Sequence, residues 1–183
     1  MKNILLVLLV VVVGFVLFVS SRPSQFRVER SASVSAPPST VYAQIADFHQ
    51  WPAWSPWEHI DPAMTKKLSG SDSGNGAVYE WTGNDKVGQG RMTITDAQPG
   101  QKVVIRLEFM KPFSATNITT FALSPEAAGT HVSWVMEGRN NFVAKCMGLF
   151  MSMDKMVGGD FDRGLASLKQ VSESAPAGGS AAN

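Results

Sequence analysis

The chain has very little cysteine and almost no net charge. Cys146 is the single cysteine among 183 residues, so an internal disulfide is excluded and the cysteine count indicates no redox compartment. Sixteen basic residues against fifteen acidic ones give a net charge of +1, without an acidic tail or a basic run. A basic field that could attract nucleic acid is therefore absent, and we expect no nucleic-acid partner.

Signatures of metal, phosphate and nucleophile chemistry are also missing. The three histidines, His49, His59 and His131, show no ligand spacing and have no cysteine pair near them, so we expect no metal site. The glycines between 83 and 90 join two expected strands and do not lead into a helix, as a phosphate-binding loop requires. No Gly-x-Ser-x-Gly motif occurs. The sequence thus predicts neither a cofactor nor a metal, and it favours binding over catalysis.

One long hydrophobic run is present, at residues 4–19, where every residue is apolar or glycine behind Lys2. As a helix this run measures about 24 Å, and with its polar flanks it approaches the length that spans a hydrocarbon core of about 30 Å. We interpret residues 1–21 as an uncleaved single-pass membrane anchor, followed by a linker at 22–25. A cleaved signal peptide is the alternative, although Val19 and Ser21 make a poor cleavage site.

The side of the membrane on which the rest of the chain lies stays open. The short N-terminus with Lys2 favours an exported domain, whereas Arg22, Arg27 and Arg30 favour the reverse by the positive-inside rule. Of these two orientations, we prefer the one in which the domain is extracytoplasmic.

Residues 26–171 show the patterns of one α+β domain. A strand from Phe26 to Ser35 comes first, and six more segments with alternating apolar residues follow at short spacing, which is typical of an antiparallel meander. In the segment 102–110, Val103, Ile105, Leu107 and Phe109 share the face expected to point inward. The six segments are 64–68, 77–82, 87–96, 102–110, 113–123 and 130–138.

Helical patterns flank this meander. A first helix begins at Ala36-Pro37-Pro38 and stops at Trp51-Pro52, where the segment Trp51-Pro-Ala-Trp-Ser-Pro-Trp57 holds three of the five tryptophans. Apolar residues recur every three to four positions from Val143 to Val171, which predicts a long C-terminal helix. We expect an interruption at Gly158-Gly159, with Asp160 capping a second segment, and a disordered tail at 172–183.

Several motifs add a family resemblance over residues 26 to about 171. The motifs are Ala36-Pro-Pro-Ser-Thr-Val-Tyr42, Trp54-Ser-Pro-Trp57, Tyr79-Glu-Trp-Thr-Gly-Asn84, Gly88-Gln-Gly-Arg-Met92, Gly129-Thr-His-Val-Ser-Trp134 and Gly164-Leu-Ala-Ser-Leu-Lys169. The chain resembles the polyketide cyclase/dehydrase group of the START-like, birch-pollen-allergen-like (SRPBCC) superfamily. This resemblance implies a helix-grip fold, in which a curved antiparallel sheet of about seven strands wraps around the long C-terminal helix. The apolar N-terminal segment departs from the soluble members.

A ligand cavity between sheet and C-terminal helix is the functional hypothesis that we rank first. Aromatic and methionine side chains line such spaces well, because methionine is flexible and polarizable. The expected occupant is a small apolar molecule or a lipid, held by a domain tethered to the membrane through residues 4–19; the oligomeric state stays open. The candidate ligand-binding residues are Trp54, Trp57, Tyr79, Trp81, Met92, Phe109, Trp134, Met147 and Met151.

Two alternatives stay open. A cyclase, dehydratase or hydrolase-like enzyme would use Glu80 or Arg91, provided that either side chain points into the cavity, where a lone charge needs a partner or a ligand. A protein-interaction module of the cell envelope would instead expose the tryptophan segment as an apolar patch. The first requires a charged group inside, and the second requires exposed tryptophans at 51–57.

Overall fold

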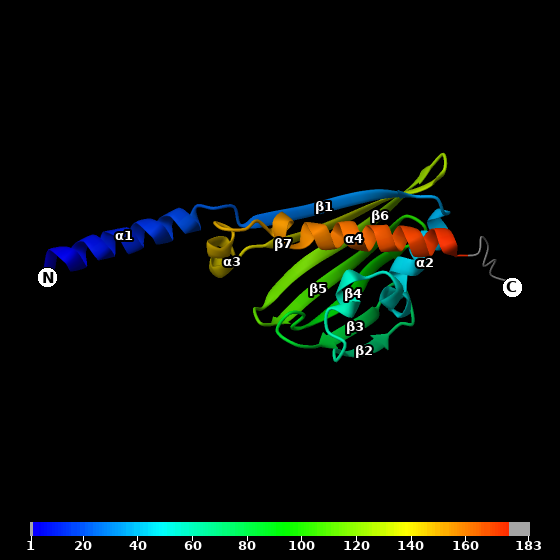
Figure 1. The fold of residues 1–183 in the computed structure, drawn as a ribbon, viewed down its shortest axis with the longest axis horizontal. Helices are drawn as coiled ribbons and strands as arrows, with labels where there is room; N and C mark the ends of the chain where they lie inside the picture. Colours follow the sequence, from blue (N-terminus) through cyan, green and yellow to red (C-terminus); the bar gives the residue numbers. More distant parts are fainter. Residues whose placement is uncertain (1, 176–183) are drawn as a thin grey trace.

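A curved, seven-stranded antiparallel sheet forms the body of the molecule (Figure 1) in a computed structural model that describes residues 2–175. Its strands run in the order β1-β7-β6-β5-β4-β3-β2, so that only β1 leaves the meander order and pairs with the last strand. The strands are β1 Gln25–Val34, β2 Thr65–Gly70, β3 Ala77–Thr82, β4 Gln89–Gln98, β5 Lys102–Lys111, β6 Ala115–Glu126 and β7 Gly129–Arg139. The expected sheet is therefore confirmed.

Alternation along the strands separates an inner from an outer face. On β5, Val103 and Ile105 are fully buried, while Arg106 and Glu108 form an ion pair on the outside at 2.7 Å. The charges that alternate with the apolar residues are matched across the outer face in the same way, as between Arg27 and Glu137 at 2.6 Å. The period-two pattern of the sequence thus identifies the inner face correctly.

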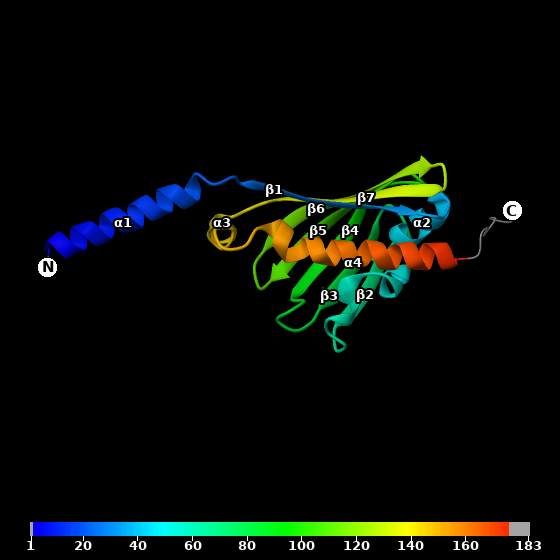
Figure 2. The same ribbon diagram turned by 45° about the horizontal axis from the view of Figure 1, so that its top comes forward.

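Helix α4 (Met153–Ser174) lies along the inner face of the sheet, as Figures 1 and 2 show. Its buried residues Phe161, Leu165 and Leu168 point toward the sheet, and the ring of Phe161 stacks on that of Trp134 with 4.2 Å between the centroids. In this packing the apolar face of the sheet and the apolar stripe of the helix bury each other. The helix-grip architecture is confirmed.

The break in the C-terminal helical pattern lies elsewhere than the sequence predicts. Helix α3 (Phe142–Met147) ends ahead of a short connection at 148–152, and α4 then continues without interruption through Gly158 and Gly159. Both helices have side-chain caps: Asn141 accepts a hydrogen bond from the Ala144 amide, and Ser152 accepts one from that of Lys155. The expected cap at Asp160 is wrong.

Gly158 has a packing role instead. A Cβ atom there would collide with the guanidinium of Arg30 on β1. Arg30 bonds to Asp154 at 2.8 Å and to Asp162 at 3.3 Å, one helical turn on either side of the glycine. The hydrogen bond from Arg30 lowers the pKa of Asp154 below its usual value. The absence of a side chain at Gly158 thus permits the close approach of the Arg30 side chain.

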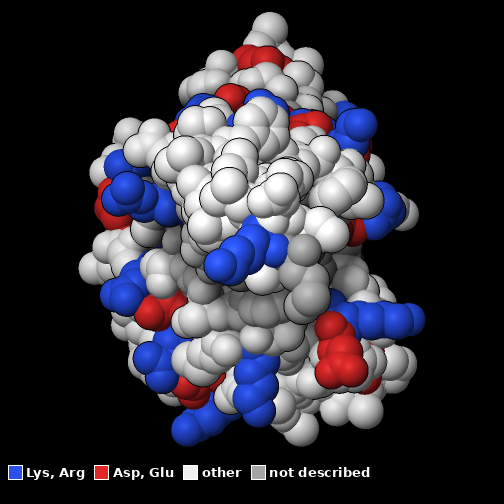
Figure 3. All heavy atoms as spheres, turned by 90° about the vertical axis from the view of Figure 1, so that its left-hand side faces the viewer, with Lys and Arg blue, Asp and Glu red and all other residues white. Residues whose placement is uncertain are grey.

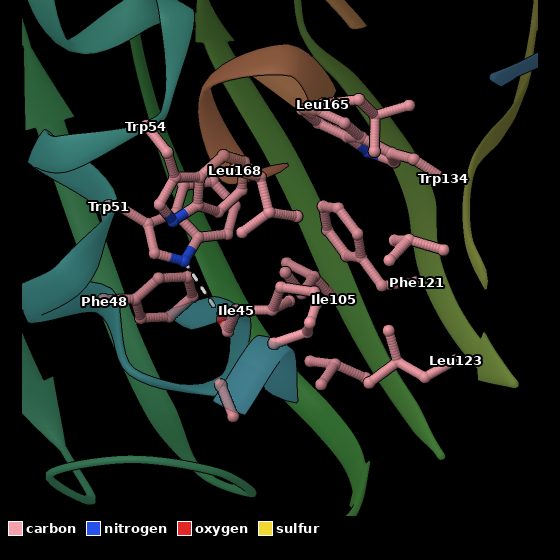
Figure 4. Packing of buried hydrophobic residues seen from close by; sticks show 14 of the residues in the cluster. Ile45, Phe48, Trp51, Trp54, Ile105, Phe121, Leu123, Trp134, Leu165 and Leu168 are labelled. Carbon is pink, nitrogen blue, oxygen red and sulfur yellow. Dashed lines mark hydrogen bonds between the residues drawn. The ribbon is translucent and has the colours of Figure 1, made fainter. Parts of the chain in front are cut away.

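The tryptophan segment closes one end of the space under the sheet. Helix α2 (Pro38–Ala46) is followed by two short 3₁₀ helices, η1 (Phe48–Ala53) and η2 (Pro56–His59), because the prolines do not permit a regular helix. Figure 4 shows Trp51 and Trp54 entering the core from this segment and meeting Phe121 of the sheet and Leu168 of α4.

Helix α1 (Lys2–Ser20) projects away from the domain at the end where β1 begins (Figures 1 and 2). Its most hydrophobic stretch of 18 residues has a mean hydropathy of 3.0, so α1 is long and apolar enough to cross a membrane or to be a signal sequence. At the other end of the chain, α4 extends to Ser174, into the segment expected as a tail. The remainder of that expected tail, from residue 176, lies outside the described residues.

Candidate functional site

A cavity of about 910 Å³ lies between the inner face of the sheet and α4. Trp51 and the 3₁₀ segments close its deep end, and the walls come from β3 to β7 and from Phe161 on α4. Its mouth is formed by the loops that join β3 to β4 and β5 to β6, by α3 and by the connection to α4. A volume of this size lies in the upper part of the range for ligand sites, which is roughly 300–1,000 Å³.

Most of the predicted binding residues line this cavity. They are Trp57, Tyr79, Trp81, Met92, Phe109, Trp134, Met147 and Met151. Trp54 does not line it, because its side chain is packed in the core at 2% exposure, and Trp51 takes that place. Met147 and Met151 lie at the mouth and are about half exposed. Contact between these residues and a ligand stays a prediction.

Several aromatic rings of the lining meet edge to face. Trp57 meets Trp134 at 5.7 Å and Phe161 at 6.1 Å between ring centroids, and Trp81 meets Phe109 at 5.8 Å. Such arrangements are favourable beyond the area that they bury, so they fix the shape of the wall. The cavity is a preformed apolar space.

One carboxylate enters the cavity lining, and it is Glu58 of η2. Glu58 is 7% exposed, its Oε1 accepts a hydrogen bond from the Tyr79 hydroxyl at 2.6 Å, and its Oε2 accepts one from Lys66 Nζ. Burial raises the pKa of the Tyr79 phenol well above its usual value, and the bond to Glu58 raises it further. The phenol therefore stays neutral and donates, and the carboxylate is compensated by two donors.

Asn117 on β6 is a second polar group of the lining. It is buried, and among residues 2–175 its amide Nδ2 finds a hydrogen-bond partner only in the sulfur of Met136, at 3.8 Å. The lack of a side chain at Gly138 makes room for it, since a Cβ atom there would collide with Asn117 Oδ1. An amide with so weak a partner can still bond to a ligand.

The candidate catalytic pair lies outside the cavity. Glu80 and Arg91 occupy opposite positions on β3 and β4, on the outer face of the sheet, and Arg91 donates two hydrogen bonds to Glu80 Oε1 at 2.7 and 3.0 Å. The bonds to Arg91 lower the pKa of Glu80, and the ion pair is open to solvent. Neither group lines the cavity, so their position removes the basis for the enzymatic hypothesis that depended on them.

The tryptophan segment does not form an exposed recognition patch. Trp51 and Trp54 are 3% and 2% exposed, and Trp57 is half-buried against Trp134 and Phe161. An interaction module that displays these three rings is incompatible with their burial. Among residues 2–175, moreover, no three His, Cys, Asp or Glu side chains lie close enough together to hold a metal ion.

Comparison with known families gives a match over nearly the whole domain. A family model described as polyketide cyclase / dehydrase and lipid transport matches residues 25–173. A search of curated proteins finds no match.

Solved structures with the same fold cover about four fifths of the chain. Protein CV1439 from Chromobacterium violaceum is 20% identical with a TM-score of 0.57, and the alignment covers 84% of this chain and 100% of that one. An uncharacterized protein from Rhizobium leguminosarum is 13% identical with a TM-score of 0.60, covering 82% and 96%. The Aha1 dimer from Colwellia psychrerythraea is 14% identical with a TM-score of 0.59, covering 82% and 98%. These similarities establish the fold.

Proposed function

The chain belongs to the polyketide cyclase / dehydrase and lipid transport family, and from this premise we propose that its domain binds a small hydrophobic molecule or a lipid in the cavity under α4. The observation that carries the proposal is the cavity itself. It measures about 910 Å³, and its wall consists mainly of aromatic rings, methionines and aliphatic side chains. Water finds few hydrogen-bond partners in such a space. Binding of an apolar molecule of matching size is favourable there, because it removes the apolar surface of that molecule from water.

The polar groups of the lining suggest an amphiphilic ligand. Glu58 with Tyr79, and Asn117 farther along the sheet, are isolated polar points on an otherwise apolar wall. A few such groups orient a ligand in a pocket whose affinity is mainly hydrophobic. A hydroxyl or amine on the ligand would donate to Glu58, and a carbonyl or hydroxyl would bond to the Asn117 amide.

Tethering to a membrane is the second part of the proposal. Nineteen residues of α1 span about 29 Å as a helix, close to the thickness of a hydrocarbon core. The side chains from Ile4 to Phe18 are exposed and, apart from Gly14, large and apolar, which suits a lipid environment. We keep the extracytoplasmic side as the preferred orientation, which protease protection of sealed vesicles would test.

The binding proposal is tested by obstructing the cavity. Met92 and Leu107 lie opposite each other on β4 and β5 and both line the space. Organic extraction and mass spectrometry of the purified full-length protein should detect a bound apolar molecule. In Met92→Trp/Leu107→Trp its amount should fall by at least about tenfold, because two indole rings then occupy the ligand volume.

A control variant places the same rings outside. Ile118 and Thr120 lie on the outer face of β6, and neither lines the cavity. Ile118→Trp/Thr120→Trp should therefore retain the bound molecule. The proposal fails if the natural chain yields no bound molecule and its melting temperature does not change with fatty acids or other apolar amphiphiles.

A further inference from the structure

The cavity mouth lies at the end of the domain from which α1 departs (Figures 1 and 2). Lys145 of α3 donates a hydrogen bond to the Ser20 carbonyl at the end of α1 at 3.0 Å, and Val19 is fully buried there. Four residues connect α1 to β1, so the first residue of β1 lies within about 18 Å of the end of α1 in any conformation. If α1 spans a bilayer, the mouth is held at its surface.

Six large apolar side chains surround the mouth without being covered by the domain. This apolar rim consists of Phe113, Phe142, Val143, Met147, Phe150 and Met151, and their exposed fractions range from 45% to 90%. Phe150 is the most exposed, in the connection between α3 and α4. Contiguous apolar groups of this kind mark a surface that contacts another apolar phase.

The charged residues that line the cavity near its mouth are basic. Five of the cavity-lining residues are basic, namely Arg22, Lys86, Lys111, Arg139 and Lys145, and we refer to them as the basic rim. The single acidic residue of the lining is the internal Glu58. Figure 3 views the molecule from this end, with Lys and Arg side chains, and Asp and Glu side chains between them, around the uncharged atoms of α1.

In the part of the chain that the structure describes, the basic rim has no carboxylate partners, unlike most of the other basic residues. Eight Lys and Arg side chains form ion pairs with carboxylates, among them Arg27, Arg30 and Arg91. Within residues 2–175, none of the five basic-rim residues forms such a pair. Cations that surround an apolar patch and lack partners within the domain complement the headgroups of an anionic lipid surface.

We infer that the cavity mouth docks on an anionic phospholipid bilayer, with the apolar rim in the interface and the basic rim against the headgroups. The inference rests on the proposed anchor and deepens the proposed function. An interfacial apolar patch with flanking cations is the usual composition of a surface that lies in the headgroup region. A ligand could then pass between bilayer and cavity without crossing bulk water.

The lone cysteine permits a direct test on the full-length chain. Cys146 lies on α3 at the mouth, so the native protein can be labelled there with a polarity-sensitive fluorophore. The labelled chain is reconstituted in nanodiscs of phosphatidylcholine with about one third phosphatidylglycerol, carrying lipids with a quencher near the headgroup. Docking predicts strong quenching and blue-shifted emission. A label at the opposite end, in Cys146→Ser/Ala128→Cys on the β6–β7 turn, should show neither effect.

Two variants and a control identify the groups responsible. Phe150→Glu changes a side chain that is 90% exposed and so leaves folding intact, and Lys111→Glu reverses one charge of the basic rim. Each should lower the quenched fraction of the Cys146 label by at least half or so, and replacing phosphatidylglycerol with phosphatidylcholine should have a similar effect. Lys67→Glu makes the same charge change on β2, at a residue that does not line the cavity, and should have no effect.

The outcomes separate this inference from the proposed function. Equal, water-like emission of the two labels overturns the docking, including the case in which the chain does not enter the nanodisc. A bound apolar molecule recovered from such a sample would leave the binding proposal intact. Conversely, quenching that depends on Phe150 and Lys111, without any molecule in the cavity, supports the docking and contradicts the binding proposal.

Discussion

At the scale of single residues, Trp51 and Trp54 show how a short aromatic segment supports a helix end. Their indole nitrogens donate to the carbonyls of Ile45 and Gln44, at 3.0 and 3.1 Å, in the last turn of α2. Carbonyls in the last turn of a helix have no partner within the helix. The two rings therefore complete the hydrogen bonding of α2 while they fill the core below the deep end of the cavity.

Removing these donors should destabilise the domain. Trp51→Phe and Trp54→Phe should each lower the free energy of unfolding by about 1–3 kcal/mol, since each leaves a carbonyl without its partner and removes part of a buried ring. Trp57 provides the control because, among the described residues, its indole nitrogen donates no hydrogen bond and its ring is only partly buried. Equal losses for all three variants in urea denaturation would argue against a capping role.

The sequence identifies the apolar lining of the cavity better than its polar groups. Alternation along β5 is enough to place Phe109 on the inner face, whereas the sequence of β3 leaves open whether Glu80 or its neighbours Tyr79 and Trp81 point inward. The same alternation was available for Asn117, which shares its parity with Phe121 and Thr119 on β6. Glu58 gave no comparable signal, because a 3₁₀ segment between two prolines has no periodicity that shows which side chains point inward.

At the scale of elements, the glycines of α4 have opposite surroundings. Gly164 faces the sheet, where an added Cβ would lie 2.7 Å from Cζ3 of Trp134 and 3.2 Å from Cδ of Pro56. Gly159 faces outward, and the nearest atom to an added Cβ there is the flexible Arg163 Nη1 at 3.6 Å. One glycine permits close packing of helix and sheet, and the other leaves room for a side chain.

Substitution by alanine should therefore have effects of opposite sign. Gly159→Ala should raise the free energy of unfolding by about 1 kcal/mol, the usual gain in a helix interior. Gly164→Ala should lower it by about 1–3 kcal/mol, because the overpacking of Trp134 exceeds that gain. Thermal and urea denaturation of both variants would measure the difference, and a stabilised Gly164→Ala protein would contradict the packing described.

The break in the C-terminal helical region lies between α3 and α4, and not at Gly158-Gly159 as the sequence predicts. A 3.6-residue pattern from Val143 to Val171 continues across the connection at 148–152, since Met147, Phe150 and Met153 keep helical spacing. The pattern there does not come from burial, because Phe150 is almost fully exposed at the mouth. Gly158-Gly159 was the more visible break in composition, yet a helix tolerates glycine where a neighbour such as Arg30 packs against it.

At the scale of the whole molecule, the short link between α1 and β1 determines how the proposed anchor acts. With α1 in a bilayer, the link would confine the mouth to the membrane surface and so give a high local concentration of headgroups around the basic rim. Salt screens the attraction between exposed charges, while a covalent link does not respond to salt. The link and the rim thus hold the mouth by two independent means.

Lengthening the link separates these two means. Inserting a Gly/Ser segment of about twelve residues after Ser21 should bring the root-mean-square reach to roughly 22 Å. In the chain with the longer link, quenching of the Cys146 label should persist at low salt and disappear at high salt. In the natural chain, most of the quenching should remain at both salt concentrations. Identical salt dependence of the two proteins would contradict a contribution of the short link.

The position of the tryptophans also gives the protein an optical property. All five indoles of the chain belong to one connected aromatic group: Trp54 touches Trp51 and Trp134, Trp57 touches Trp134, and Trp81 reaches the group through Tyr79 and Phe48. The ultraviolet emission of the chain thus originates around the cavity, where the close rings exchange excitation energy. Entry of a molecule into the cavity would change the wavelength and the lifetime of this fluorescence, so the occupancy of the cavity can be followed in the unmodified protein.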